Sequence, residues 1–263
     1  MPSMTEAIEA LYEAFKRYPR PNKIECCPCG CTPPDATAHL VVKPLRDLPF
    51  ADLADYSFSA MTTQGSVDDF RHFLPRLLEG IAKEPYTYCA ETLFHKISYG
   101  KWITWPQEEQ SAIMQYLDAL WRYSLESFPI ERHLPACDEI ESVLSSIAQT
   151  GLSLSPYLED WAETQTIAAD EHLIQLVTMH GSEFASGQMV IQGYWADAKV
   201  QAQKLRSWLL LPETLQRVKR ESHLLRNDGF EHLFIPSLHA LEEASGNSLN
   251  YDFITQNLHS PQA

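Results

Sequence analysis

The chain of 263 residues contains no long apolar run. No stretch approaches the ~20 consecutive apolar residues that span a bilayer. Near the start, Glu6, Glu9 and Glu13 occupy the region where a signal peptide would be apolar. We therefore expect a cytoplasmic protein that has no membrane partner.

The common catalytic motifs are also missing. The sequence has no H-E-x-x-H, G-x-S-x-G, G-x-G-x-x-G or phosphate-loop pattern. These absences argue against the familiar metalloprotease, hydrolase, dinucleotide-binding and nucleotide-binding classes. An enzyme with an arrangement of its own is left open, but the sequence favours a protein without catalytic activity.

Basic residues are scarce, with 20 lysines and arginines against 35 aspartates and glutamates, which gives a net charge of -15. Such a surface repels phosphate backbones, so we expect no nucleic-acid partner. The charge is uneven, because residues 199–226 hold seven basic and only two acidic residues. The acidic remainder either attracts a basic partner or is an ordinary solvated surface.

Alternating β-branched runs are absent, whereas the 3.6-residue period of amphipathic helices recurs along the chain. Ser3 and Glu6 have the spacing of a capping box, and Ser66 precedes Asp69 in a similar way. Pro75 interrupts the helical pattern that follows, so we expect a kink or a restart there. The pattern predicts an all-α fold, either a multi-helix bundle or an irregular α-solenoid-like array of about ten to twelve helices. We expect subdomains at 1–130 and 131–263, or one continuous domain.

Cysteine is sparse too, yet four of the six cysteines fall in one short turn: Cys26, Cys27, Cys29 and Cys31. Two to four residues between thiolates is the usual spacing around zinc, and Pro28 with Gly30 allows the chain to curl. A second ligand pair is not visible, so Cys89, Cys137, His39, His72 or His95 would have to complete the site. The open alternatives are a zinc or other soft-metal site, a reduced and partly buried turn, and a redox or disulfide function.

A second candidate site is polar and lies at the start of one predicted helix. Carboxylates in a first turn favour the positive end of the helix dipole. A histidine and an arginine four residues apart lie on one helix side, where they would bind an anion or make surface pairs. The residues of this predicted polar site are Asp68, Asp69, Arg71, His72 and Arg76.

Three segments carry a family resemblance. The run "CCPCGC", the segment from "KPLRDLPF" through "DFRHFLPRLLE", and "KWITWPQEE" resemble a family of uncharacterised bacterial helical proteins. The resemblance covers residues 8 to 125, and "DFRHFLPR" is its most specific part. The tandem arrangement of cysteines departs from the simpler pair typical of that family. The resemblance implies a bacterial, cytoplasmic, helical protein and no particular reaction.

These observations predict a non-enzymatic protein that binds another protein through a helical surface. One concrete form is an immunity protein that neutralises a bacterial toxin, because toxins that act on nucleic acid are often basic. The alternative is a metal-binding enzyme or sensor that uses zinc in the Cys26–Cys31 cluster, with His72 beside it.

Overall fold

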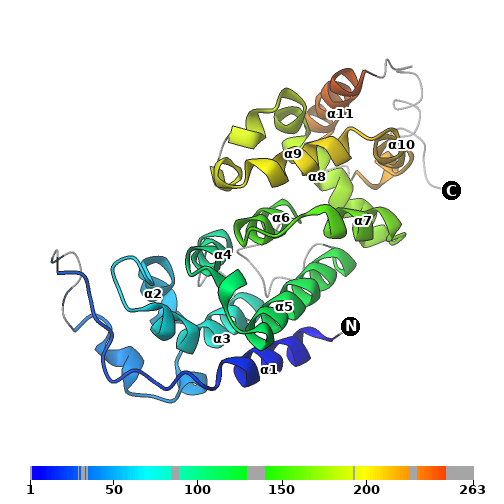
Figure 1. Ribbon diagram of the computed structural model, residues 1–263. Helices are drawn as coiled ribbons and strands as arrows, with labels where there is room; N and C mark the ends of the chain where they lie inside the picture. Colours follow the sequence, from blue (N-terminus) through cyan, green and yellow to red (C-terminus); the bar gives the residue numbers. More distant parts are fainter. Residues whose placement is uncertain are drawn as a thin grey trace. The chain divides into compact units, whose positions relative to one another are not determined.

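The computed structural model describes residues 2–28, 30, 33, 35–83, 89–128, 140–191, 193–225 and 230–246. Within these ranges the chain forms eleven α-helices and several 3-10 helices (Figure 1). The same ranges contain two isolated β-bridges and no strand. The predicted all-α array of about ten to twelve helices is confirmed.

The chain divides into two compact units. Among the described residues, unit 1 contains residues 2–123, and unit 2 contains residues 124–128 and those from 140 onward. The predicted boundary between residues 130 and 131 falls in the range 129–139, which lies outside the described residues.

Unit 1 is built around α3, whose buried face carries Phe70, Phe73, Leu74 and Leu77. This face follows the 3.6-residue period, and α1 packs along the same helix. Short 3-10 helices at Ala38–Val41, Leu45–Asp47, Phe50–Leu53 and Trp102–Thr104 join the longer elements. The α-helices of unit 1 are α1 (Met4–Phe15), α2 (Ala54–Ser59), α3 (Val67–Lys83), α4 (Ala90–Tyr99) and α5 (Gln107–Glu126), although the last three residues of α5 belong to unit 2.

The caps predicted from the sequence are present at α1 and α3. Ser3 and Glu6 form a complete capping box. The Ser66 backbone N–H donates to Asp69 at 2.7 Å, and the Asp69 N–H donates to the Ser66 hydroxyl at 3.1 Å. Of the two outcomes expected at Pro75, the restart is wrong, because α3 continues through this residue, and the kink stays a prediction. Pro75 is itself buried, so the helix retains a continuous apolar face although one backbone hydrogen bond is lost.

Unit 2 buries large aromatic side chains. The rings of Trp161 and Trp208 stack with centroids 5.0 Å apart, and α8 packs along α11. A Cβ at Gly181 would lie 3.0 Å from Ser237 Cβ, so glycine permits the close approach of these two helices. The helices of unit 2 are α6 (Ile140–Gln149), α7 (Ser155–Glu163), α8 (Ile167–Ser186), α9 (Lys199–Leu209), α10 (Pro212–Arg220) and α11 (Glu231–Ser245).

The helices can also be tested as membrane spans. Among the described residues, none is both long enough and apolar enough to cross a bilayer. This finding agrees with the absence of long apolar runs from the sequence.

Candidate functional site

The predicted polar site begins at the first turn of α3. Asp69 caps the helix through Ser66, while the exposed Asp68 accepts a hydrogen bond from Arg71 Nη1 at 3.3 Å. The capping role predicted for these carboxylates is therefore present in the structure. Neither residue requires a ligand to explain its position.

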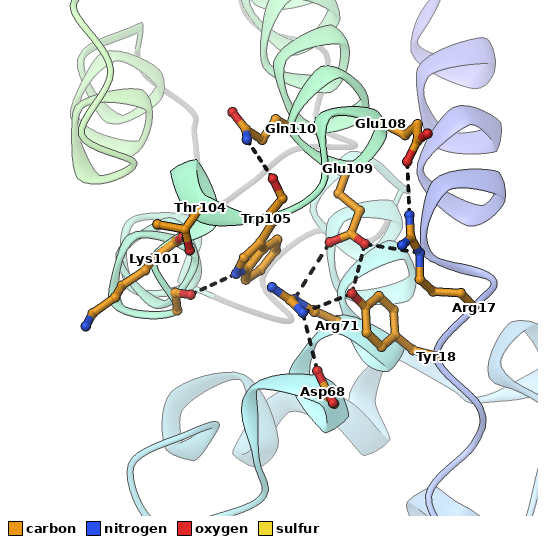
Figure 2. Close-up of polar contacts among 11 residues, drawn as sticks. Arg17, Tyr18, Asp68, Arg71, Lys101, Thr104, Trp105, Glu108, Glu109 and Gln110 are labelled. Carbon is orange, nitrogen blue, oxygen red and sulfur yellow. Dashed lines mark hydrogen bonds and ion pairs between the residues drawn. The ribbon is translucent and has the colours of Figure 1, made fainter.

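Arg71 lies in a buried charge cluster, which Figure 2 shows, with Glu109 at its centre. The Glu109 side chain is 0% exposed. Its carboxylate accepts a hydrogen bond from the Tyr18 hydroxyl at 2.8 Å, and ion pairs join it to Arg17 Nε at 3.4 Å and Arg71 Nε at 3.7 Å. Two guanidinium groups thus compensate one carboxylate that has lost all contact with water.

Trp105 forms one wall of this cluster. The Arg71 guanidinium lies 4.4 Å from the centroid of the Trp105 ring, a cation–π distance. The indole N–H donates to the Gly100 carbonyl at 2.9 Å, and Gln110 donates to the Trp105 carbonyl at 2.7 Å (Figure 2). These bonds fix the turn before α5 and hold Glu109 in place.

His72 is buried beside this cluster but has a separate contact. Its Nδ1 lies 3.0 Å from the Tyr18 carbonyl, which only accepts, so Nδ1 carries the proton. Nε2 is buried and has no hydrogen-bond partner among the described residues. Burial lowers the pKa of His72, which favours the neutral ring.

Arg76 belongs to a second network on α3. It donates twice to the Leu48 carbonyl, at 2.9 and 2.7 Å, and once to Glu79 at 2.7 Å. Glu79 also accepts hydrogen bonds from Tyr12 at 2.5 Å and from Lys83 at 2.7 Å. Burial would raise the pKa of Glu79, but these three hydrogen bonds outweigh it and the pKa is lowered.

A cavity of about 350 Å³ lies between the two networks. Tyr12, Tyr18 and His72 line it, and its charged groups balance, because Glu9 and Glu13 face Arg46 and Lys16. Arg46 already pairs with Glu9 through two hydrogen bonds. The cavity therefore has no charge preference for an anion, and the five residues of the predicted polar site do not converge on one point. Anion binding by these residues stays a prediction.

The cysteine turn is partly described. Cys26 is a half-buried thiol, and Cys27 is disulfide-bonded. Its backbone is attached to the loop before α3, since the Cys27 N–H donates to the Thr63 carbonyl at 2.8 Å. Cys29, Cys31 and Cys137 lie outside the described residues.

The described residues contain no group of three His, Cys, Asp or Glu side chains that could hold a metal ion. They therefore supply no ligand set for the predicted zinc site. A disulfide sulfur is not the thiolate that zinc binds, so a site at this turn requires Cys27 to be reduced. Cys89 contacts Glu91 at 3.3 Å and Thr92 at 3.2 Å at the start of α4. Zinc binding by Cys26, Cys27, Cys29 and Cys31 stays a prediction.

Unit 2 contains one comparable buried cluster. Arg217 donates to Asp170 at 2.6 Å, to the Trp161 carbonyl at 2.8 Å and to the Thr164 carbonyl at 2.7 Å. These bonds join α10 to α7, to α8 and to the loop between them. Each of the three guanidinium nitrogens thus donates to a structural acceptor, and Arg217 is buried.

The outer side of α7 is different. Glu159 and Glu163 are exposed, lie four residues apart and therefore share one side of the helix. Neither has an ion-pair partner among the described residues of either unit. Residues 133–198, which include all of α7 and α8, contain no lysine or arginine. We call Glu159, Glu163 and the neighbouring Ile167 the acidic junction of α7 and α8.

Sequence reasoning missed Glu109, because "PQEEQ" resembles an ordinary acidic first turn. A signal was available, since Glu109 lies on the same stripe of α5 as the buried Ile113, Leu117 and Leu120. A carboxylate on a buried stripe requires a partner, and the arginines 38 and 92 residues earlier in the chain are brought to it only by the fold.

Comparison with known proteins adds no relative. No protein-family model matches the chain, and neither curated proteins nor solved structures give a match. The resemblance of residues 8 to 125 to a bacterial family therefore stays an expectation, and the case for function rests on the chain's own geometry.

Proposed function

We propose that the chain is a non-enzymatic protein that binds a basic protein partner through the acidic junction of α7 and α8. Its concrete form is an immunity protein that neutralises a basic toxin. The observation that carries this proposal is the pair of exposed carboxylates, Glu159 and Glu163, in a part of the chain without a single lysine or arginine.

The carboxylates of unit 1 support the proposal by contrast. Glu9, Glu79 and Glu109 each contact an arginine, so their charge is neutralised within the unit. Glu159 and Glu163 of α7 have no such compensation among the described residues. A charge that the chain does not neutralise itself remains available to a partner.

Exposed carboxylates act mainly on the rate of encounter. Complementary surface charge raises association rates from about 10⁵–10⁶ to as much as about 10⁸–10⁹ M⁻¹s⁻¹ at low salt. Rapid capture suits a protein that must neutralise a toxin before the toxin acts. Ile167, four residues after Glu163 at the start of α8, is 69% exposed and adds exposed apolar area to this segment.

The experiment is co-expression of the chain with the basic proteins encoded by neighbouring genes, followed by measurement of binding in rising salt. We expect one of them to co-purify, with an association rate that falls as salt screens the charges. The double variant Glu159→Lys with Glu163→Lys should lose most of that rate. Asp35→Lys with Asp47→Lys, two exposed positions of unit 1, is the matched control with the same change of charge and should bind normally. Binding that is indifferent to the first pair would contradict the proposal.

A further inference from the structure

The turn between α4 and α5 presents two apolar side chains to solvent. Tyr99 is 54% exposed and Ile103 is 69% exposed, with the exposed Lys101 between them. Gly100 and Trp102 alternate with these residues and are buried. The segment therefore has an anchored inner side and an apolar outer side. We call residues 99–103 the Tyr99–Ile103 turn.

The backbone of this turn is held rigidly. Lys101 adopts the left-handed conformation, with φ 57° and ψ 45°, which is unfavourable for a non-glycine residue. The Thr104 hydroxyl and backbone N–H both donate to the Lys101 carbonyl at 2.8 Å. The Trp105 indole N–H donates a hydrogen bond to the Gly100 carbonyl. Aromatic and aliphatic side chains on a fixed backbone lose little entropy on binding, which makes them effective anchors.

The turn is also locally positive in an acidic chain. Between Glu91 and Glu108 the sequence contains two lysines and no aspartate or glutamate. The Lys96 ammonium is buried and donates to the Thr62 hydroxyl at 3.0 Å. Neither Lys96 nor Lys101 has an ion pair among the described residues, so this turn favours an acidic partner surface.

The chain itself carries a surface of that chemistry. The acidic junction of α7 and α8 combines Glu159 and Glu163 with Ile167 and has no basic residue nearby in sequence. A lysine between two apolar side chains is complementary in charge and polarity to two carboxylates that are followed in the chain by an apolar side chain. The two surfaces are different patches, so a contact between two copies would be heterologous.

We propose that the Tyr99–Ile103 turn of one copy docks on the acidic junction of α7 and α8 of a second copy. Each copy then offers one turn and one junction, so the contact grows into a chain or closes into a ring. Because a few side chains bury less than the ~1,200 Å² of a stable interface, the association is weak. It depends on protein concentration and on salt. A second copy and the basic partner of the proposed function would compete for the same carboxylates, but self-association requires no such partner.

The test uses two full-length variants that remove opposite halves of the contact. Tyr99→Ser with Ile103→Ser removes the turn's anchors, and Glu159→Lys with Glu163→Lys reverses the junction. By sedimentation velocity, the unmodified chain should form dimers and larger species as its concentration rises. Each variant alone should stay monomeric. An equimolar mixture should form a 1:1 complex and nothing larger, because one intact turn and one intact junction remain.

A mixture that stays monomeric, or an unmodified chain that is monomeric at every concentration, would overturn this inference. Dimers that survive in both variants would show that another surface is used. Lys101→Glu should weaken the association of the unmodified chain about tenfold, equivalent to about 1.4 kcal/mol, and adding salt should act in the same direction. Circular dichroism of every variant verifies that the helices are retained. Because the partner of the proposed function is absent here, failure of this test leaves that proposal standing.

Discussion

Units 1 and 2 both bury a glutamate, but they surround it differently. In unit 1, Glu79 accepts hydrogen bonds from Tyr12, Arg76 and Lys83, and its pKa is lowered. In unit 2, Glu242 is 1% exposed and forms an ion pair with Lys219, and burial raises its pKa despite that pair. Burial alone therefore does not fix the state of a carboxylate, because the number of donors around it decides which form is favoured.

The same contrast extends to the surface. Unit 1 directs its arginines to its own carboxylates, as at Glu9 and Glu109. In unit 2, Arg217 pairs with the half-buried Asp170, while Glu159 and Glu163 of α7 remain exposed. This difference is the basis of our proposal that the exposed carboxylates of α7 serve recognition, whereas the buried charge networks of both units serve stability.

The largest effect should come from Glu109. The variant Glu109→Leu leaves Arg71, which is 17% exposed, without its buried carboxylate. Removing one member of a buried ion pair costs about 3–5 kcal/mol, and urea unfolding measures that loss. Glu108→Gln is the matched control, because Glu108 is 75% exposed and its pair with Arg17 contributes less than about 1 kcal/mol. Equal losses in the two variants would contradict the role of the buried cluster.

A somewhat smaller effect is expected in unit 2 from Arg217→Lys. Lysine retains the charge but cannot reproduce the planar fork that reaches Asp170, Trp161 and Thr164 together. We expect a loss of about 2–3 kcal/mol in the free energy of unfolding. Hydrogen exchange should accelerate in α7, α8 and α10 and remain unchanged in α3. Equal acceleration in α3 would remove the distinction between the units.

Glu79→Gln and Glu242→Gln should respond to pH in opposite directions. The lowered pKa of Glu79 means that its contribution is present above its ordinary value of 4.5 and is lost as pH falls. The raised pKa of Glu242 means that its contribution is present below 4.5 and is lost as pH rises through the folded-state value. Glu79→Gln should therefore cost about 1–2 kcal/mol at pH 7 and little in acid. Glu242→Gln should become relatively more favourable as pH rises, and parallel pH profiles would refute this contrast.

The smallest expected effect concerns a buried histidine in each unit. Burial lowers the pKa of both His72 and His172, and each ring contacts a backbone carbonyl. The unfolded chain then binds more protons near pH 6, so stability should fall as pH drops below the ordinary histidine pKa of 6.5. His72→Gln and His172→Gln should each flatten part of this dependence in urea unfolding. A slope unchanged in both variants would exclude these histidines as its source.

The fold was predictable to the extent that it depends on local patterns. The helical period, the caps at Ser3 and Ser66 and the apolar stripe of α3 follow from neighbouring residues. At Pro75 the sequence left a kink and a restart open, and the buried face that favours a continuous α3 became visible only in the fold.

The candidate site was less predictable, because its contacts are distant in sequence. Arg71 was identified as a polar residue of interest, but its partner Glu109 lies on another helix. A sequence gives the charge of each residue, whereas the compensation of a buried charge depends on which elements the fold brings together. The exposed carboxylates of α7 have a signal in the sequence, because residues 133–198 contain no lysine or arginine, but only the fold shows that Glu159 and Glu163 are exposed.

The most direct test of the proposed function is the association rate of a co-purifying basic partner with the chain and with its two charge-reversal pairs. We predict that Glu159→Lys with Glu163→Lys slows association at least about tenfold at low salt, and that the difference shrinks as salt is added. The control pair Asp35→Lys with Asp47→Lys, in unit 1, should associate at the unmodified rate. Equal slowing by both pairs would show that only net charge matters and would contradict a recognition surface at the acidic junction of α7 and α8.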